Sequence, residues 1–168
     1  MSGVTVESKA DRPFTVTAVA ANHLFFVDEP KALGGDDSGP APYDYLLAAL
    51  GSCTAMTLRM YAKRKGWPLE GIAIRLSHDR IQETDGGRSE HHSSRSERIT
   101  CEIELTSEID ASQREKLIKI AAKCPVHRTL LGGVQIVDRL ADAPIPGNPP
   151  PDEAVETQAE ATGGGMSA

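Results

Sequence analysis

Two cysteines, Cys53 and Cys124, are the side chains of this sequence with the clearest capacity for chemistry. Cys53 lies near the middle of the apolar stretch from Pro42 to Gly66, and Cys124 lies far downstream in the segment AAKCPVHRTL. A thiolate that reacts with a peroxide becomes a sulfenic acid, which condenses with a second thiol to a disulfide. The two cysteines therefore suggest peroxide chemistry, and the alternative is that each is a small packing residue.

The neighbours of Cys53 on a helix are apolar, and they include Leu50 and Met56. A thiol in such surroundings has a raised pKa and is unreactive. Arg59 is six residues further along, about 120° away around the helix, so it does not share the face of Cys53. An activating arginine or histidine must therefore come from another part of the fold.

The position of Cys124 is different, because the next residue is a proline. Pro125 suits the first position of a helix, which would make Cys124 the N-cap. A thiolate at an N-cap is stabilised by free N–H groups and by the helix dipole. His127 lies within the same first turn.

Other candidate residues have simpler explanations. Cys101 lies on the inward face of a predicted strand and is expected to fill core space. His78 continues the apolar face of its strand and His23 opens another, so each is expected to be a core or interface histidine. His91 and His92 are adjacent, without the spacing that brings two metal ligands onto one face, so we expect no metal site. Fingerprints for phosphate or dinucleotide binding are absent, so we expect no cofactor.

Composition narrows the class of protein. The 168 residues suffice for one domain with a core. A net charge of −6 and 4% aromatic residues argue against nucleic-acid binding. Three cysteines do not form a secreted disulfide framework. No signal segment or membrane-spanning run is visible, so we expect a cytoplasmic protein with no membrane partner.

The stretch Pro42–Gly66 predicts one long helix that contains Cys53. Pro42 suits its first position, three basic residues occupy its last turn, and Gly66 suits its C-terminal stop. Residues 45–50 are apolar around the whole circumference, which is typical of a helix inside a core. Small residues on this helix would let another backbone approach, so we expect a homodimer in which two copies of the helix pair.

The remaining pattern predicts antiparallel strands and two further helices. Strands are expected at Val4–Ser8, Phe14–Ala20, His23–Asp28, Ile72–Gln82, Arg95–Thr106 and Val134–Val137, with a loop at Thr84–Ser94. Asp110 and Gln113 predict the capped start of a helix that ends at Cys124, and Pro125 opens a short helix. We therefore expect an α+β domain over residues 1–140 and an acidic, Pro- and Gly-rich tail over 141–168, disordered or loosely packed.

Two long blocks, GGDDSGPAPYDYLLAALGSCTAMTLRMYAKRKGWPLEG and KCPVHRTL, resemble the OsmC/Ohr family of osmotically inducible and organic hydroperoxide resistance proteins. They are most similar to its YhfA-like branch, and the likeness spans roughly Val4 to Arg139. The resemblance implies an OsmC-like α+β fold in which an antiparallel sheet wraps around long buried central helices in an intertwined homodimer. It also implies that Cys53 is the peroxidatic cysteine and Cys124 the resolving one.

The implied activity is that of a thiol-dependent peroxidase in oxidative-stress defence. Cys53 would become a sulfenic acid, Cys124 would form a disulfide with it, and an external thiol or dithiol would reduce the disulfide. An apolar pocket would suit an organic hydroperoxide, and its expected lining is Leu46, Leu50, Met56 and Met60. The alternative is a non-enzymatic binder of small hydrophobic ligands on the same fold.

The sequence departs from the family pattern at the expected activating groups. Organic-hydroperoxide members carry a glutamate ten residues before the first cysteine, and Tyr43 occupies that position here. Asp44 is one residue off and about 180° around the helix from Cys53. Arg12 is the sole arginine before the helix. The candidates for polarising the site instead are His23, His78 and His127.

Overall fold

The computed structural model describes residues 3–82 and 95–147. The predicted loop at Thr84–Ser94, with its histidine pair, and the tail from residue 148 lie outside the described residues. The chain divides into two compact units, Met1–Tyr45 with Val137–Ala168, and Leu46–Ile136. The strands are antiparallel in both units, and the helices occupy separate stretches of the sequence. The predicted α+β class is therefore confirmed.

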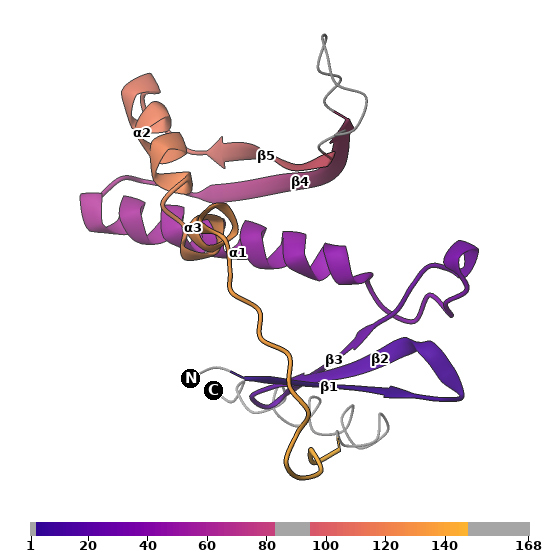
Figure 1. Cartoon of the computed structure of the whole chain (residues 1–168). Coiled ribbons are helices and arrows are strands. Elements are labelled where there is room, and N and C mark those ends of the chain that lie inside the picture. The colour runs from indigo at the N-terminus through magenta and orange to yellow at the C-terminus, as the bar shows by residue number, and fades with distance from the viewer. Residues whose placement is uncertain (1–2, 83–94, 148–168) are drawn as a thin grey trace, which may run out of the picture. The chain divides into compact units, whose positions relative to one another are not determined.

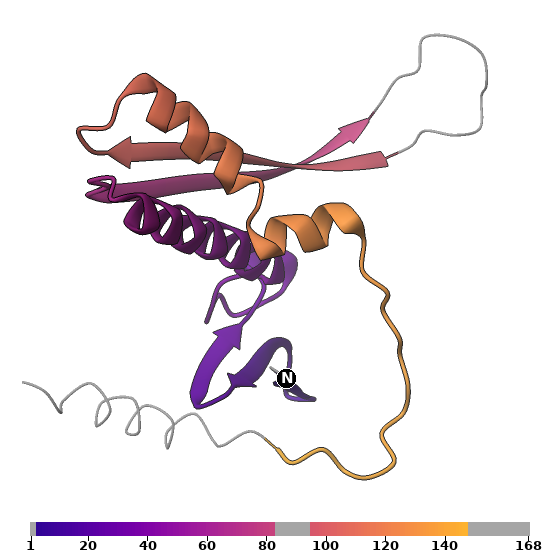
Figure 2. The ribbon, with the colours of Figure 1, turned by 90° about the vertical axis from the view of Figure 1, so that its left-hand side faces the viewer.

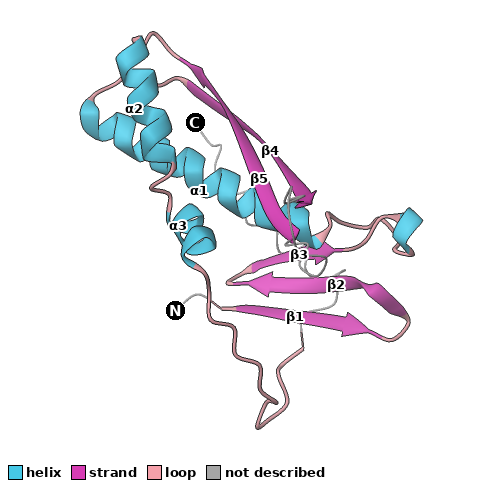
Figure 3. Ribbon diagram, turned by 45° about the horizontal axis from the view of Figure 1, so that its top comes forward, coloured by secondary structure: helices cyan, strands magenta, loops and turns pink. Residues whose placement is uncertain are grey.

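The first unit contains a three-stranded antiparallel meander. Its strands are β1 (Val4–Lys9), β2 (Arg12–Ala20) and β3 (His23–Val27), with β2 in the centre (Figure 3). Ala21 and Asn22 form the turn between β2 and β3, and Ala21 adopts a positive φ of 54° there. The β-branched residues that predicted β2 thus lie in the middle of the sheet, where both edges are paired.

A buried carboxylate, Asp28, organises the loop that follows β3 (residues 28–40). Asp28 is 1% exposed and accepts hydrogen bonds from the hydroxyl of Thr15 (3.3 Å) and from three backbone N–H groups. The hydroxyl of Ser38 also donates to it at 2.7 Å. Gly35 packs so tightly here that a Cβ would lie 1.9 Å from the carbonyl oxygen of Glu29. The loop is therefore a defined structure built around one charge.

We expect Asp28→Asn to destabilise this unit. The hydrogen bond from Ser38 is the main cause that lowers the pKa of Asp28 to about 2, with backbone N–H groups adding to it against the effect of burial. An asparagine amide would place a donor against these donors. We expect the melting temperature to fall by roughly 5 °C or more at neutral pH.

The sign of the pH dependence follows from the lowered pKa of Asp28. The stabilisation is present above the carboxyl's unfolded pKa of ~4 and is lost as pH falls towards 2. The difference in melting temperature between wild type and Asp28→Asn should therefore become smaller as pH falls from ~4 to about 2. A difference in melting temperature that stays constant from pH 7 to pH 2 would contradict the role assigned to the charge of Asp28.

Helix α1 (Pro42–Lys65) begins and ends where the sequence predicts. Gly66 follows with a φ of 67°, the left-handed geometry that favours glycine at a helix stop. Along the second unit, α1 runs beside the β4–β5 hairpin (Figure 1). Its buried residues recur at helical spacing: Leu50, Gly51, Thr54, Leu58 and Ala62. The helix therefore has one buried face within this chain.

The core of the second unit forms where α1, the hairpin and helix α2 (Ala111–Ala121) meet. Strands β4 (Gly71–Gln82) and β5 (Arg95–Thr106) pair antiparallel, as predicted. The predicted capping box is confirmed, since Asp110 and Gln113 exchange side chain–backbone hydrogen bonds. The buried cluster comprises Leu58, Ala62, Leu69, Ile109, Leu117, Ile120 and Ala121.

Two expectations for the C-terminal half were wrong. Helix α2 ends at Ala121 rather than at Cys124, because the N–H groups of Lys123 and Cys124 bond to carbonyls three residues back. The strand expected at Val134–Val137 is absent, and these residues are irregular and exposed. A β-rich pattern forms a strand where a neighbouring strand pairs with it.

Helix α3 (Pro125–Gly132) is present as predicted. Within residues 3–82 and 95–147, no helix is long and apolar enough to cross a membrane.

Candidate active site

Cys53 and Cys124 lie close together in the second unit, where each thiol shifts the pKa of the other. Cys53 comes from the middle of α1, and Cys124 is the N-cap residue of α3, whose start lies beside α1 (Figure 2). Both are free thiols. The 70 residues that lie between them in the sequence are thus folded so that the two cysteines come close together.

Cys53 is half-buried, and the pKa of its thiol is raised. Burial raises its pKa, and the nearby Cys124 thiol raises it further. The N–H of Val126 and the hydroxyl of Thr57 oppose this shift without reversing it.

Cys124 is fully buried but has a lowered pKa. Burial by itself raises the pKa, and the effects of the nearby Cys53 thiol, the N–H of His127, the hydroxyl of Thr54 and the N–H of Val126 outweigh it. The sulfur closes no conventional cap hydrogen bond, but it lies at the N-terminus of α3, where N–H groups are free.

Two threonines that sequence reasoning missed complete the surroundings of the sulfurs. Thr54 is 3% exposed and acts on Cys124, whereas Thr57 acts on Cys53. The Thr57 hydroxyl donates its hydrogen bond to the backbone carbonyl of Cys53 at 2.8 Å. The i+4 spacing could have indicated Thr57 as a neighbour of Cys53. Nothing in the sequence indicated Thr54, because its partner comes from another helix.

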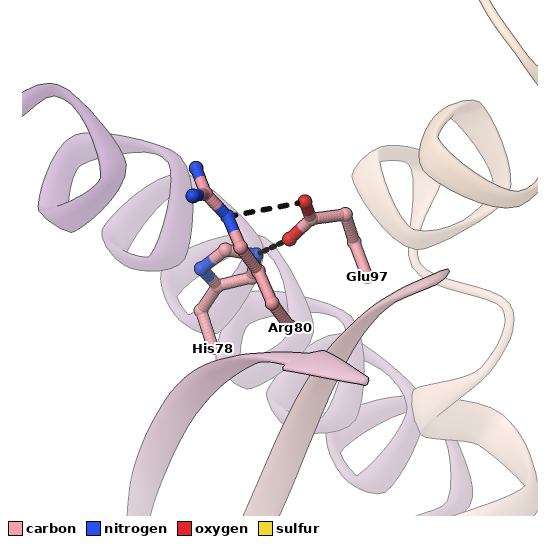
Figure 4. Close-up of polar contacts among 3 residues, drawn as sticks. All are labelled: His78, Arg80 and Glu97. Atoms are coloured by element: carbon pink, nitrogen blue, oxygen red, sulfur yellow. Dashed lines mark hydrogen bonds and ion pairs between the residues drawn. The ribbon is translucent and has the colours of Figure 1, made fainter. Parts of the chain in front are cut away.

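Three basic side chains of this unit, those of Arg59, His78 and Arg80, have partners away from the cysteines. The side chain of Arg59 donates to the carbonyls of Leu69 and Glu70. His78 Nε2 lies 2.5 Å from one carboxylate oxygen of Glu97, and Arg80 Nε lies 3.5 Å from the other (Figure 4). His127 acts on Cys124 through its backbone N–H. In the part of the chain that the structure describes, no basic side chain is among the groups that shift the pKa of either cysteine.

The comparison with protein families decides the identity of the fold. The profile of the OsmC-like protein family matches residues 35–137, which include both cysteines. The chain belongs to the OsmC-like family. The family resemblance seen in the sequence is thereby confirmed, and the YhfA-like branch stays a prediction. None of the curated proteins that were compared matches the chain.

Solved structures agree with this assignment. An OsmC-like protein from Mycoplasma pneumoniae is 21% identical, covers 79% of this chain and 88% of its own, and has a TM-score of 0.63. An organic hydroperoxide resistance protein OsmC from Legionella pneumophila is 15% identical, with 76% and 87% coverage and a TM-score of 0.55. OhrB of Bacillus subtilis, also an organic hydroperoxide resistance protein, is 15% identical, with 76% and 88% coverage and a TM-score of 0.54. At these identities the likeness shows the shared fold.

The four apolar residues proposed to line a pocket in this OsmC-like protein have different environments. Leu46 is half-buried and Leu50 is 3% exposed. Met56 and Met60 are 65% and 72% exposed, on the outer side of α1. The two methionines therefore present a surface, while Leu50 belongs to the buried face of the helix.

Three further candidates of the OsmC-like chain, Arg12, His23 and Asp44, belong to the first unit. Arg12 is exposed and borders a cavity of about 310 Å³ over β1 and β2, whose lining includes Glu7 and Asp11. His23 is exposed at the start of β3. The carboxylate of Asp44 accepts a hydrogen bond of 3.0 Å from the N–H of Ala41, so it caps the first turn of α1.

Cys101 departs from its predicted role. It pairs across the sheet with Leu76, on the face of the hairpin that the alternation predicted. It is nevertheless exposed rather than packed in the core, because the buried cluster gathers around α2 and the opposite end of the hairpin. The pKa of Cys101 is raised by burial of its sulfur and by the nearby charge of Cys124.

Among the described residues, no group of three or more potential ligands could hold a metal ion.

Proposed function

We propose that this OsmC-like protein is a thiol-dependent reductase of hydroperoxides, with organic hydroperoxides as its main substrates. The observation that carries the proposal is that Cys53 lies close enough to the buried Cys124 for each thiol to shift the pKa of the other. Structures with the same fold are named as organic hydroperoxide resistance proteins in Legionella pneumophila, Elizabethkingia anophelis and Bacillus subtilis. The names support a redox role, and the cysteine pair supplies its chemistry.

In the proposed reaction, Cys53 is the peroxidatic cysteine. Its thiolate attacks the O–O bond, takes up one oxygen as a sulfenic acid and releases an alcohol. Cys124 then condenses with the sulfenic acid, which releases water and forms a disulfide. An external thiol or dithiol reduces the disulfide by exchange. The half-buried position of Cys53 fits this order, because it is the more accessible sulfur of the two.

The proposal extends to the setting of the reaction. A homodimer would let a second copy supply groups to Cys53, which has no basic partner among the described residues of its own chain. A reducing cytoplasm would keep the resting cysteines as thiols and supply the reductant. Defence against oxidative stress is the role that such a reductase would serve.

A second candidate function is binding of a small hydrophobic ligand without catalysis. The raised pKa of Cys53, caused first by burial, is the observation that favours it, because a protonated thiol reacts slowly. The two functions differ in whether a hydroperoxide changes the thiols of the protein.

We expect one equivalent of an alkyl hydroperoxide to lower the count of free thiols in the denatured protein from three to one. The remaining thiol should be Cys101, and peptide mass mapping should find Cys53 joined to Cys124. A dithiol should restore all three thiols. If three thiols persist after the peroxide has been added in excess, the binding function is favoured and the reductase is excluded.

A further inference from the structure

The cavity over β1 and β2 in the first unit is lined by side chains that the proposed reaction does not use. Its volume of about 310 Å³ lies in the range of sites for small ligands. The lining consists of two cations, two carboxylates, two hydroxyls and one aromatic ring: Lys9, Arg12, Glu7, Asp11, Thr15, Thr17 and Phe26. Lys9, Asp11 and Arg12 are exposed, whereas the other four are half-buried. The cavity therefore has a charged rim, and its more buried wall includes hydroxyls and the aromatic ring.

The backbone at the turn between β1 and β2 explains how this charged rim forms. Ser8 pairs with Val16, but the next residue of β1, Lys9, pairs with Arg12. Residues 13–15 of β2 thus have no partner on β1, and an irregularity of this kind changes the direction of the side chains beside it. Lys9 and Arg12 lie directly opposite each other as a result, so two positive charges face one another across the turn.

The charges of this rim have no direct partners. Like charges in directly opposite positions of two paired strands are destabilising. Within residues 3–82 and 95–147, no carboxylate forms an ion pair with Lys9 or Arg12, and no cation forms one with Asp11. An anionic group bound between Lys9 and Arg12 would offset their repulsion, and a cationic group beside Asp11 would neutralise its carboxylate.

We propose that this cavity binds a free α-amino acid. The carboxylate of the ligand lies between Lys9 and Arg12, its ammonium group lies beside Asp11, and its side chain extends toward Phe26. A guanidinium group suits this role, because its N–H groups match the two oxygens of a carboxylate. The inference does not depend on the proposed reductase, because no residue of the cavity takes part in that reaction.

The balance of charge in the lining favours a zwitterion over a simple anion. Two cations and two carboxylates give the lining no net charge, so a phosphate ion would meet the repulsion of Glu7 and Asp11. A ligand that carries both a carboxylate and an ammonium group complements both signs of charge. The Thr15 hydroxyl donates to Asp28 at 3.3 Å, so its oxygen keeps lone pairs that can accept from the ammonium group.

Thermal melts of the full chain with the common amino acids, each added separately in the millimolar range, test the proposal. A ligand that binds only the folded protein raises its melting temperature, and we expect at least one amino acid to do so. Isothermal titration calorimetry then gives its Kd. The amide of that amino acid lacks the carboxylate and its N-acetyl derivative lacks the ammonium group, so each should bind about 10-fold more weakly or worse. The proposal is overturned if no amino acid raises the melting temperature, or if either derivative binds as tightly as its parent.

Variants of the rim test whether the amino acid binds in this cavity. Arg12→Gln and Asp11→Asn each remove one charge at an exposed position, so both proteins should fold, and each should bind the amino acid about 10-fold more weakly than wild type. The matched control is Arg75→Gln, which removes an exposed cation of β4 that pairs with Glu102, and its affinity should equal that of wild type. Wild-type affinity in Arg12→Gln, or equal weakening in all three variants, would overturn the proposal. So would inorganic phosphate that binds wild type more tightly than any amino acid, because the cavity would then be an anion site.

Discussion

Replacing Cys53 with serine is expected to lower the rate of hydroperoxide consumption by about 10³-fold or more, to the uncatalysed background. Serine keeps the size and the hydrogen-bonding capacity of the side chain but cannot form a sulfenic acid. The measurement is consumption of an alkyl hydroperoxide in the presence of a dithiol. The effect is large because every step of the proposed cycle begins at this sulfur.

The matched control is Cys101→Ser, which removes the exposed third thiol on β5. Its rate should equal that of wild type, because Cys101 makes no bond in the proposed cycle. A Cys53→Ser protein that retains wild-type activity would show that peroxide reacts at another site. Loss of activity in both variants would point to a general requirement for thiols or for an undisturbed fold.

The largest expected effect on stability comes from Leu117→Ala. Leu117 on α2 is 0% exposed and belongs to the buried cluster with Leu58 and Ile120. Truncating such a side chain removes its transfer free energy and leaves a cavity, so we expect a loss of about 3 kcal/mol in the free energy of unfolding. Denaturant titration at a fixed protein concentration measures it, and thermal melts should shift by about 10 °C.

The control for Leu117→Ala is the next residue, because Ile118 is 50% exposed on the same helix. Ile118→Ala removes a side chain of the same volume at a position where less apolar surface is buried, so the loss of stability is smaller. The high helix propensity of alanine offsets part of this loss. We expect a change below about 1 kcal/mol. Similar losses for the two variants would mean that the face of α2 carrying Ile118 is also covered, as it would be in a dimer.

The elements that position the site follow from local rules. Pro42, the basic last turn and Gly66 set the bounds of α1, because each acts on its own turn of helix. Asp110 and Gln113 set the start of α2 in the same way. Alternation set the pairing of β4 with β5. These features depend on residues within a few positions of one another, so they can be predicted without the rest of the chain.

Burial and pairing between distant segments could not be predicted in this way. Alternation placed Cys101 on the correct face of β5, but the extent to which that face is covered depends on where α2 packs. The pattern at Val134–Val137 suited a strand, but a strand exists where another strand offers its N–H and C=O groups. In both cases the missing information is the position of a partner that lies far away in the sequence.

The same division applies to the cysteines. Residue types and the N-cap position of Cys124 were enough to select the pair and to predict that the second sulfur favours a thiolate. The folded chain alone places Cys53 and Thr54 of α1 against Cys124. A pKa reflects every donor and all the buried surface around a group, and here these come from two helices brought together by packing. That packing raises the pKa of Cys53 and lowers the pKa of Cys124.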